Sequence, residues 1–162
     1  MEPSDFFNEN LWNNILELDR NTKNVYQAGI DILNPILFTK DICKSESNPE
    51  DAITYCFSDA LRDFFDRPSV YFLYDRGKKQ TPPQFSDLVY IGITKNLMLR
   101  IAQHFIGMPS TPKKIFDCFG FIFVKSIQDA SKIENILVSA FKPKYNDRLT
   151  DFIDSKISDW LG

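Results

Sequence analysis

The chain has 162 residues, a formal net charge of −3 and 43% hydrophobic residues, a composition that excludes an intrinsically disordered protein. Its length is that of one domain with an extension, and no apolar run approaches the roughly 20 residues that a membrane-spanning helix needs. Three cysteines without C-x-x-C spacing and a single histidine exclude a disulfide framework and a histidine-based metal cluster. Because the N-terminus also lacks the pattern of a targeting segment, we expect an intracellular, cytoplasmic protein with no membrane partner.

Charge is distributed unevenly along the chain. Residues 1–68 hold 6 Lys/Arg against 13 Asp/Glu, for a net charge of −7. Residues 69–148 hold 12 Lys/Arg against 6 Asp/Glu, for a net charge of +6, and the last 14 residues carry −2. The acidic total therefore does not exclude a nucleic-acid partner, because the positive charge is concentrated in one segment. The alternative interpretation is an ordinary solvated surface with uneven charge.

The first 68 residues are predicted to form a helical extension. Apolar residues at helical spacing mark a helix over residues 8–18. Asn48, Pro49 and the two acidic residues that follow form a strong helix start, and that helix is expected to end near Pro68. This extension could support the core, contact substrate or form a dimer interface, and the sequence does not choose among these roles.

Strands are predicted over residues 70–74, 88–91 and 119–124 from their β-branched and aromatic content. A loop rich in glycine and proline over residues 75–87 joins the first two strands, which most simply pair in antiparallel fashion. These three strands and the predicted helices indicate an α+β domain.

A helix is predicted to follow the second strand, with Asn96 as its cap. Leu97 and Ile101 lie on its apolar face, whereas Arg100 and His104, four residues apart, project from another side. A strand-end tyrosine, a glycine turn and a helix that carries Arg and His together suit an anionic group.

The next helix is predicted to begin after Ser126 and to end before Pro143. Its apolar stripe includes Ile133 and Leu137, and Glu134 falls inside that stripe. A carboxylate on a packed face is costly unless it has a partner, so Glu134 needs an arginine, a metal ion or a cleft. The alternative is a glutamate at the margin of the stripe that pairs with a surface lysine.

A series of motifs runs along the chain in the order Val70-Tyr71, Tyr90-Ile91-Gly92, Asn96-Leu97, Arg100, His104, Glu134 and Lys142-Pro143-Lys144-Tyr145-Asn146. This order of residues resembles the GIY-YIG nuclease family. It departs from the family at the first motif, where Ser69-Val70-Tyr71 lacks the glycine. The loop between Tyr71 and Tyr90 is also longer than in minimal members, as in the type II restriction endonuclease branch.

The resemblance implies a small three-stranded antiparallel β-sheet flanked by helices. We expect residues 1–68 to form the N-terminal helical elaboration, residues 69–148 the nuclease core, and residues 149–162 a C-terminal docking helix.

By resemblance, the core is an endonuclease that hydrolyses DNA phosphodiester bonds with one Mg²⁺ or Mn²⁺. Tyr71 is then the general base, and Tyr90 orients the water or the scissile phosphate. Arg100 holds a phosphate oxygen through its fork of donors, and Glu134 binds the metal ion. His104 could hydrogen-bond the phenol of Tyr71.

Further expectations concern Asn146 and the lysines. Asn146 contacts a phosphate or supports one of the tyrosines, and Lys78 or Lys79 could lower the pKa of the Tyr71 phenol. The residues expected to contact nucleic acid are Lys78, Lys79, Lys95, Arg100, Lys142 and Lys144.

The expected partner is double-stranded DNA, and cutting a palindromic site would require a homodimer. Because the sequence shows no second nuclease or zinc-finger module, we favour a restriction enzyme or another defence or phage nuclease. Two alternatives stay open: a nucleic-acid-binding protein that has lost turnover, and a nuclease that acts on RNA or a small nucleotide.

Overall fold

The computed structural model describes residues 36–53, 66–109 and 111–146. The helix predicted over residues 8–18 and the docking helix expected within residues 149–162 lie outside these ranges. Among the helices that are described, none has the length and apolar character to cross a bilayer.

A four-stranded antiparallel sheet with the order β1-β4-β2-β3 forms the centre of the molecule. Its strands are β1 (Ile36–Phe38), β2 (Ser69–Tyr74), β3 (Leu88–Thr94) and β4 (Cys118–Phe123). The three predicted strands correspond to β2, β3 and β4, so the predicted α+β class is confirmed. The sheet has one strand more than predicted, because β1 is too short to show an alternating pattern and is defined by its pairing with β4.

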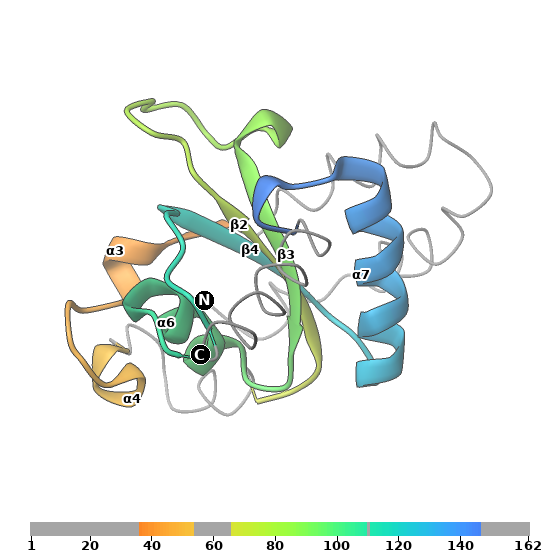
Figure 1. The fold of residues 1–162 in the computed structure, drawn as a ribbon, viewed down its shortest axis with the longest axis horizontal. Helices are drawn as coiled ribbons and strands as arrows, with labels where there is room; N and C mark the ends of the chain where they lie inside the picture. Colours follow the sequence, from red (N-terminus) through yellow and green to blue (C-terminus); the bar gives the residue numbers. More distant parts are fainter. Residues whose placement is uncertain (1–35, 54–65, 110, 147–162) are drawn as a thin grey trace, which may run out of the picture.

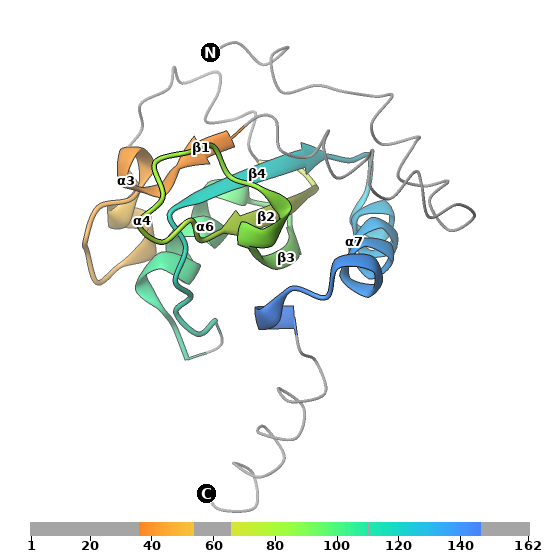
Figure 2. The ribbon, with the colours of Figure 1, turned by 90° about the horizontal axis from the view of Figure 1, so that it is seen from above.

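Helices cover both faces of the sheet (Figure 1). Helix α6 (Leu97–Ile106) lies on one face with the short helices α3 (Thr39–Ile42) and α4 (Pro49–Ala52), and α7 (Ile127–Phe141) lies on the other (Figures 1 and 2). All six residues of β2 are buried, and they alternate between two cores. Tyr71 and Leu73 belong to the core under α6, whereas Phe72 and Tyr74 belong to the core under α7.

The two long helices begin where the sequence predicts. The Asn96 side chain accepts a hydrogen bond from the Leu99 amide at 3.2 Å, and the Ser126 hydroxyl accepts one from the Asp129 amide at 3.1 Å. Helix α7 ends at Phe141 and is capped by Lys142, whose φ of 46° places it in the left-handed region immediately before proline. Two short 3₁₀ helices, Phe85–Asp87 (η3) and Lys144–Asn146 (η4), precede β3 and follow α7.

The helix predicted from Asn48 to Pro68 begins as expected but is shorter. The Asn48 side chain accepts a hydrogen bond from the Glu50 amide at 3.0 Å, and Pro49 is the first helical residue. The helix nevertheless ends at Ala52, because Ile53 is extended and bridges Cys43 in antiparallel fashion. This contact with a distant part of the chain overrides local helix propensity, and residues 54–65 lie outside the described ranges.

Gly92 is the point where strand β3 and the Tyr71 side chain come closest. The two residues face each other across the β2–β3 pair, so their side chains would share one face of the sheet. A Cβ atom on Gly92 would lie 2.5 Å from Cζ of Tyr71 and 2.7 Å from Cε1 of Tyr90. The Tyr71 ring therefore crosses over the backbone of β3 where only glycine leaves room for it.

We predict that Gly92→Ala lowers the free energy of unfolding by about 2–3 kcal/mol, because the new methyl group overpacks a site walled by two rings. Urea denaturation measures this loss. Gly77→Ala is the control: Gly77 has a φ of +63° but nothing within 4 Å of an added Cβ, so the expected loss is about 1 kcal/mol from the backbone alone. A Gly92→Ala loss no greater than that of the control would contradict the close approach.

Candidate active site

The hydroxyl of Tyr71 lies at the centre of the predicted site residues. Tyr71 occupies the middle of β2 and is 1% exposed, and its Oη lies 2.7 Å from Nε2 of His104 on α6. Leu97 and Ile101 pack α6 against the same face of the sheet and thereby place His104 over the phenol. The hydrogen bond that we expected between His104 and the phenol is therefore present.

Tyr71, Tyr90 and His104 form a cluster of three rings. Ring centroids are separated by 6.0 Å between the tyrosines, by 5.6 Å between Tyr71 and His104, and by 5.1 Å between Tyr90 and His104. We expected His104 on a side of α6 away from the apolar stripe, but it is only 2% exposed, so this expectation is wrong. His104 follows Ile101 by three residues and Leu97 by seven, a spacing that places it on the buried face of the helix.

Burial also determines the protonation state of His104. Burial, followed by the positive charges of Lys114 and Arg100, lowers the pKa of His104 from 6.5 to about 3. The imidazole is therefore neutral at neutral pH, and one of its nitrogens can accept a proton. Its Nδ1 atom has no hydrogen-bond partner within the described part of the chain.

The phenol of Tyr71 is influenced by several other predicted residues. Burial raises its pKa well above 10, and the nearby hydroxyl of Tyr90 raises it further through charge and a hydrogen bond. The charge of Arg100 lowers this pKa, and that of Glu134 raises it. Tyr71 thus carries its proton at neutral pH.

Arg100 is anchored by two polar side chains. Its Nη1 atom donates to Oε1 of Gln103 at 3.2 Å and to Oγ1 of Thr111 at 3.0 Å. Lys114 also reaches the site, where its ammonium nitrogen lies 4.6 Å from the centre of the Tyr90 ring. Gln103 could have been found from its spacing, three residues after Arg100 on the same helix. No local signal connects Thr111 with the site, since a loop brings it there.

Glu134 lies on the packed face of α7, as predicted, and is 9% exposed. Within the described ranges, no group of three or more His, Cys, Asp or Glu residues is arranged to hold a metal ion. A single carboxylate still suits Mg²⁺ or Mn²⁺, because these hard cations prefer oxygen ligands and Mg²⁺ usually keeps several waters. The donor chemistry at Glu134 therefore fits one such cation.

Asn146 pairs with the outer edge of strand β3. Its Oδ1 atom accepts from the Ile91 amide, and its Nδ2 atom donates to the Ile91 carbonyl, both at 2.8 Å. The side chain thus replaces a neighbouring strand beside Tyr90 and Gly92. Of the two roles expected for Asn146, this geometry favours support of the tyrosines.

The predicted nucleic-acid contacts are exposed lysines. Lys78, Lys79, Lys95, Lys142 and Lys144 all lie on the surface. Lys79 pairs with Asp87 at 3.0 Å. The positive charge that lowers the pKa of Tyr71 belongs to Arg100, not to Lys78 or Lys79 as we expected.

Residues 68–146 match the family model of the GIY-YIG catalytic domain. The chain is 32% identical over 106 residues to UvrABC system protein C from Nautilia profundicola, an alignment that covers 59% of this chain and 16% of that protein. The protein of the same name from Methylococcus capsulatus is 30% identical over 89 residues, which are 52% of this chain and 13% of that protein. The chain therefore spans less than a fifth of the length of these relatives.

The crystal structure of the GIY-YIG N-terminal endonuclease domain of UvrC from Thermotoga maritima, bound to magnesium, is 20% identical with a TM-score of 0.36. That similarity covers 56% of this chain and 99% of the other. At this level it carries no inference about individual residues. Residues 68–146 therefore carry the match to the GIY-YIG catalytic domain that the sequence resemblance indicates.

Proposed function

We propose that the chain is an endonuclease that hydrolyses DNA phosphodiester bonds with one divalent cation. The observation that supports this most is the convergence on the Tyr71 hydroxyl, which lies 2.7 Å from Nε2 of His104. Tyr90, Arg100 and Glu134 all alter the pKa of the same hydroxyl. Four different side chains acting on one phenol favour proton transfer over packing as its role.

In this proposal Tyr71 accepts a proton from the attacking water. Because Tyr71 is itself protonated, its own proton must move as the water proton arrives, and Nε2 of His104 lies within reach when Nδ1 carries the ring proton. The charges of Lys114 and Arg100 help to keep the pKa of His104 low. A bound phosphate would offset these charges, so the substrate itself makes His104 a better acceptor.

Arg100 and Glu134 have electrostatic roles in the proposal. Arg100 donates to a non-bridging phosphate oxygen, since Gln103 and Thr111 engage only its Nη1 atom. Glu134 would hold Mg²⁺ or Mn²⁺, and when bound such an ion stabilises negative charge on the phosphate and the leaving oxygen. The exposed lysines Lys95, Lys142 and Lys144 attract the DNA backbone, an effect that weakens as salt rises.

Cleavage of supercoiled plasmid DNA tests this proposal. We expect cutting with Mg²⁺ or Mn²⁺, no cutting with EDTA, and loss of cutting in Glu134→Gln, which removes the carboxylate charge but keeps the shape of the side chain. Asp129→Asn is the matched control, because it removes a carboxylate from the first turn of the same helix. Cutting that survives Glu134→Gln would overturn the metal-ligand role.

The same assay separates the alternatives. Discrete fragments would support the restriction enzyme that we favoured from the sequence, whereas a smear would indicate cutting without sequence specificity. DNA that is bound but never cut would favour the inactive binding protein, and cutting of RNA alone would favour the RNA nuclease. A homodimer, which palindromic cutting requires, is tested by sedimentation of the protein with and without DNA.

For Arg100→Lys, we predict a fall in kcat/KM of about 100-fold. Lysine keeps the positive charge but cannot donate to Gln103 and Thr111 while it also donates to a phosphate. Steady-state cleavage of a labelled duplex measures the change. Lys95→Ala, which removes an exposed charge beside the same helix, should lower kcat/KM far less, and equal losses in the two variants would contradict a specific role for the arginine fork.

His104 makes stability depend on pH in a defined direction. The pKa of His104 is about 3 in the folded chain and 6.5, the ordinary value for histidine, in the unfolded chain. Between pH 3 and pH 6.5 the unfolded chain therefore binds more protons than the folded chain. Stability from this residue is fully present above pH 6.5 and is lost as the pH falls, by about 2 kcal/mol between pH 7 and pH 5. Because His104 is the single histidine in the chain, His104→Gln should remove most of this dependence in urea denaturation. An unchanged dependence in the variant would contradict the buried neutral imidazole.

A further inference from the structure

A cavity of about 590 Å³ lies at the C-terminal end of strand β2. Its walls are formed by the start of α3, by the loop that follows β2, and by Phe105 and Phe116. None of the six residues predicted to be catalytic lines it. The cavity therefore holds none of the groups proposed to carry out the chemistry, although Lys78 and Lys79 in its lining are among the expected nucleic-acid contacts.

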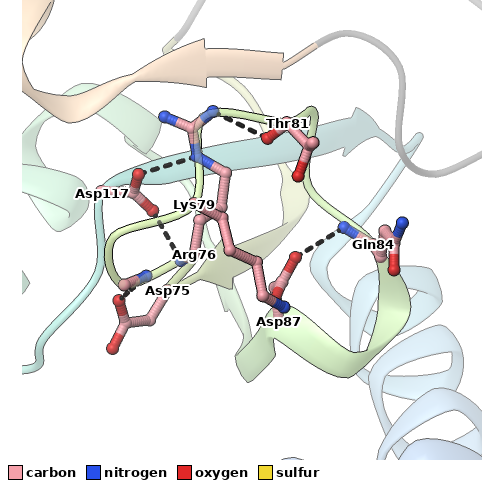
Figure 3. Close-up of polar contacts among 8 residues, drawn as sticks. Asp75, Arg76, Lys79, Thr81, Gln84, Asp87 and Asp117 are labelled. Atoms are coloured by element: carbon pink, nitrogen blue, oxygen red, sulfur yellow. Dashed lines mark hydrogen bonds and ion pairs between the residues drawn. The ribbon is translucent and has the colours of Figure 1, made fainter.

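Two of the basic residues in its lining are neutralised by acidic partners. Arg76 donates through Nε to Oδ2 of Asp117 at 2.8 Å and through Nη1 to the Thr81 carbonyl at 3.0 Å (Figure 3). Lys79 pairs with Asp87 at 3.0 Å (Figure 3). These contacts hold the loop that follows β2 to Asp117, immediately before β4, and to Asp87 in η3, so they fix this wall of the cavity.

Lys40 and Lys78 supply the positive charge of the cavity. Both line it, both are exposed, and neither has an acidic partner among the residues that the structure describes. Two ammonium groups that converge on one cavity from different parts of the chain favour an anionic ligand.

Thr39 supplies a second, independent observation. It lines the same cavity and is only 3% exposed, yet its Oγ1 atom has no hydrogen-bond partner within the described residues. Burying a hydroxyl without a partner is unfavourable, and turning this buried hydroxyl toward the cavity would let an oxygen or nitrogen atom of a ligand relieve that penalty.

The size of the cavity and the phenylalanines in its lining indicate which anion fits. A lone phosphate would leave most of 590 Å³ empty, whereas sites for small organic ligands occupy about 300–1,000 Å³. Phe105 and Phe116 contribute apolar surface to a lining that is otherwise largely polar. We propose that this cavity binds a nucleotide, with its phosphate at Lys40 and Lys78 and its base against the phenylalanines.

The nucleotide could be free, or it could belong to a strand that is bound at the active site. Arg76 follows Tyr71 by five residues, so at about 3.4 Å per residue the backbones of these two residues lie within about 17 Å of each other. A nearby nucleotide of a bound strand can reach that far. This second source rests on the proposed function, whereas binding of a free nucleotide does not.

Calorimetric titration of the full chain tests the site. The Glu134→Gln variant in EDTA prevents cutting, and the probes are deoxyadenosine monophosphate, deoxyadenosine, inorganic phosphate and a short single-stranded oligonucleotide. We expect the monophosphate to bind more tightly than deoxyadenosine or phosphate. We also expect Lys40→Ala combined with Lys78→Ala to weaken its binding by about tenfold or more. Lys132→Glu, on the exposed side of α7, changes the net charge by the same amount and should leave binding unaltered.

Thr39→Val distinguishes a ligand contact from a structural role. Valine keeps the shape of threonine without the hydroxyl, so the thermal melting temperature should stay the same or rise while nucleotide binding weakens. If Thr39→Val binds the nucleotide as tightly as the wild-type protein, or more tightly, then the hydroxyl does not contact the ligand.

Each outcome decides the proposal. If the oligonucleotide binds more tightly than the monophosphate, and its binding depends on Lys40 and Lys78, the natural ligand is a nucleotide within a strand. If the oligonucleotide and the monophosphate bind with equal affinity, the natural ligand is a free nucleotide. Phosphate binding as tightly as the monophosphate would reduce the cavity to an anion site and overturn the nucleotide. If replacing the two lysines changes the binding of none of the probes, the proposed site is overturned. Plasmid cleavage by the wild-type protein tests the nuclease proposal separately.

Discussion

The close approach of the Tyr71 ring to the backbone of Gly92 determines how the site is built. Strand β2 is buried on both faces, so the Tyr71 side chain at its middle has no direct path to solvent. The ring lies over β3 at the residue that has no Cβ. Tyr90 and His104 then complete the packing around the phenol, and Asn146 holds the outer edge of β3 through both polar groups of Ile91. The position of the Tyr71 hydroxyl thus depends on Gly92 and on the contact between Asn146 and the outer edge of β3.

The electrostatics of the site follow from the same burial. Burial raises the pKa of Tyr71 and lowers that of His104, so both groups are neutral without substrate. Arg100 and Lys114 place positive charge beside these neutral groups, and their charge is one reason why the imidazole resists protonation. An anion bound near them would reduce this resistance. The arrangement therefore links binding of a phosphate to the ability of the pair to move a proton.

Local signals explain which parts could be predicted from the sequence. Helices α6 and α7 have a cap and a clear apolar stripe, and β2, β3 and β4 have concentrated β-branched and aromatic residues, so all five were predicted near their observed bounds. Strand β1 and the early end of α4 could not be predicted, because pairing with distant segments defines both. The spacing of Arg100 and His104 placed both on one side of a helix, whereas Thr111 reaches Arg100 through a loop whose path no local pattern encodes.

The positive charge of residues 69–148 is divided among several tasks. Arg76 and Lys79 hold the loop after β2 through Asp117 and Asp87, so their charge stabilises structure and contributes little field at a distance. Arg100 and Lys114 act on the buried ring cluster. Lys78 lines the cavity at the end of β2, and its neighbour Lys79 in the same loop is paired with Asp87. A net charge summed along the sequence treats these residues alike, and only their partners show which of them remain available to attract a phosphate.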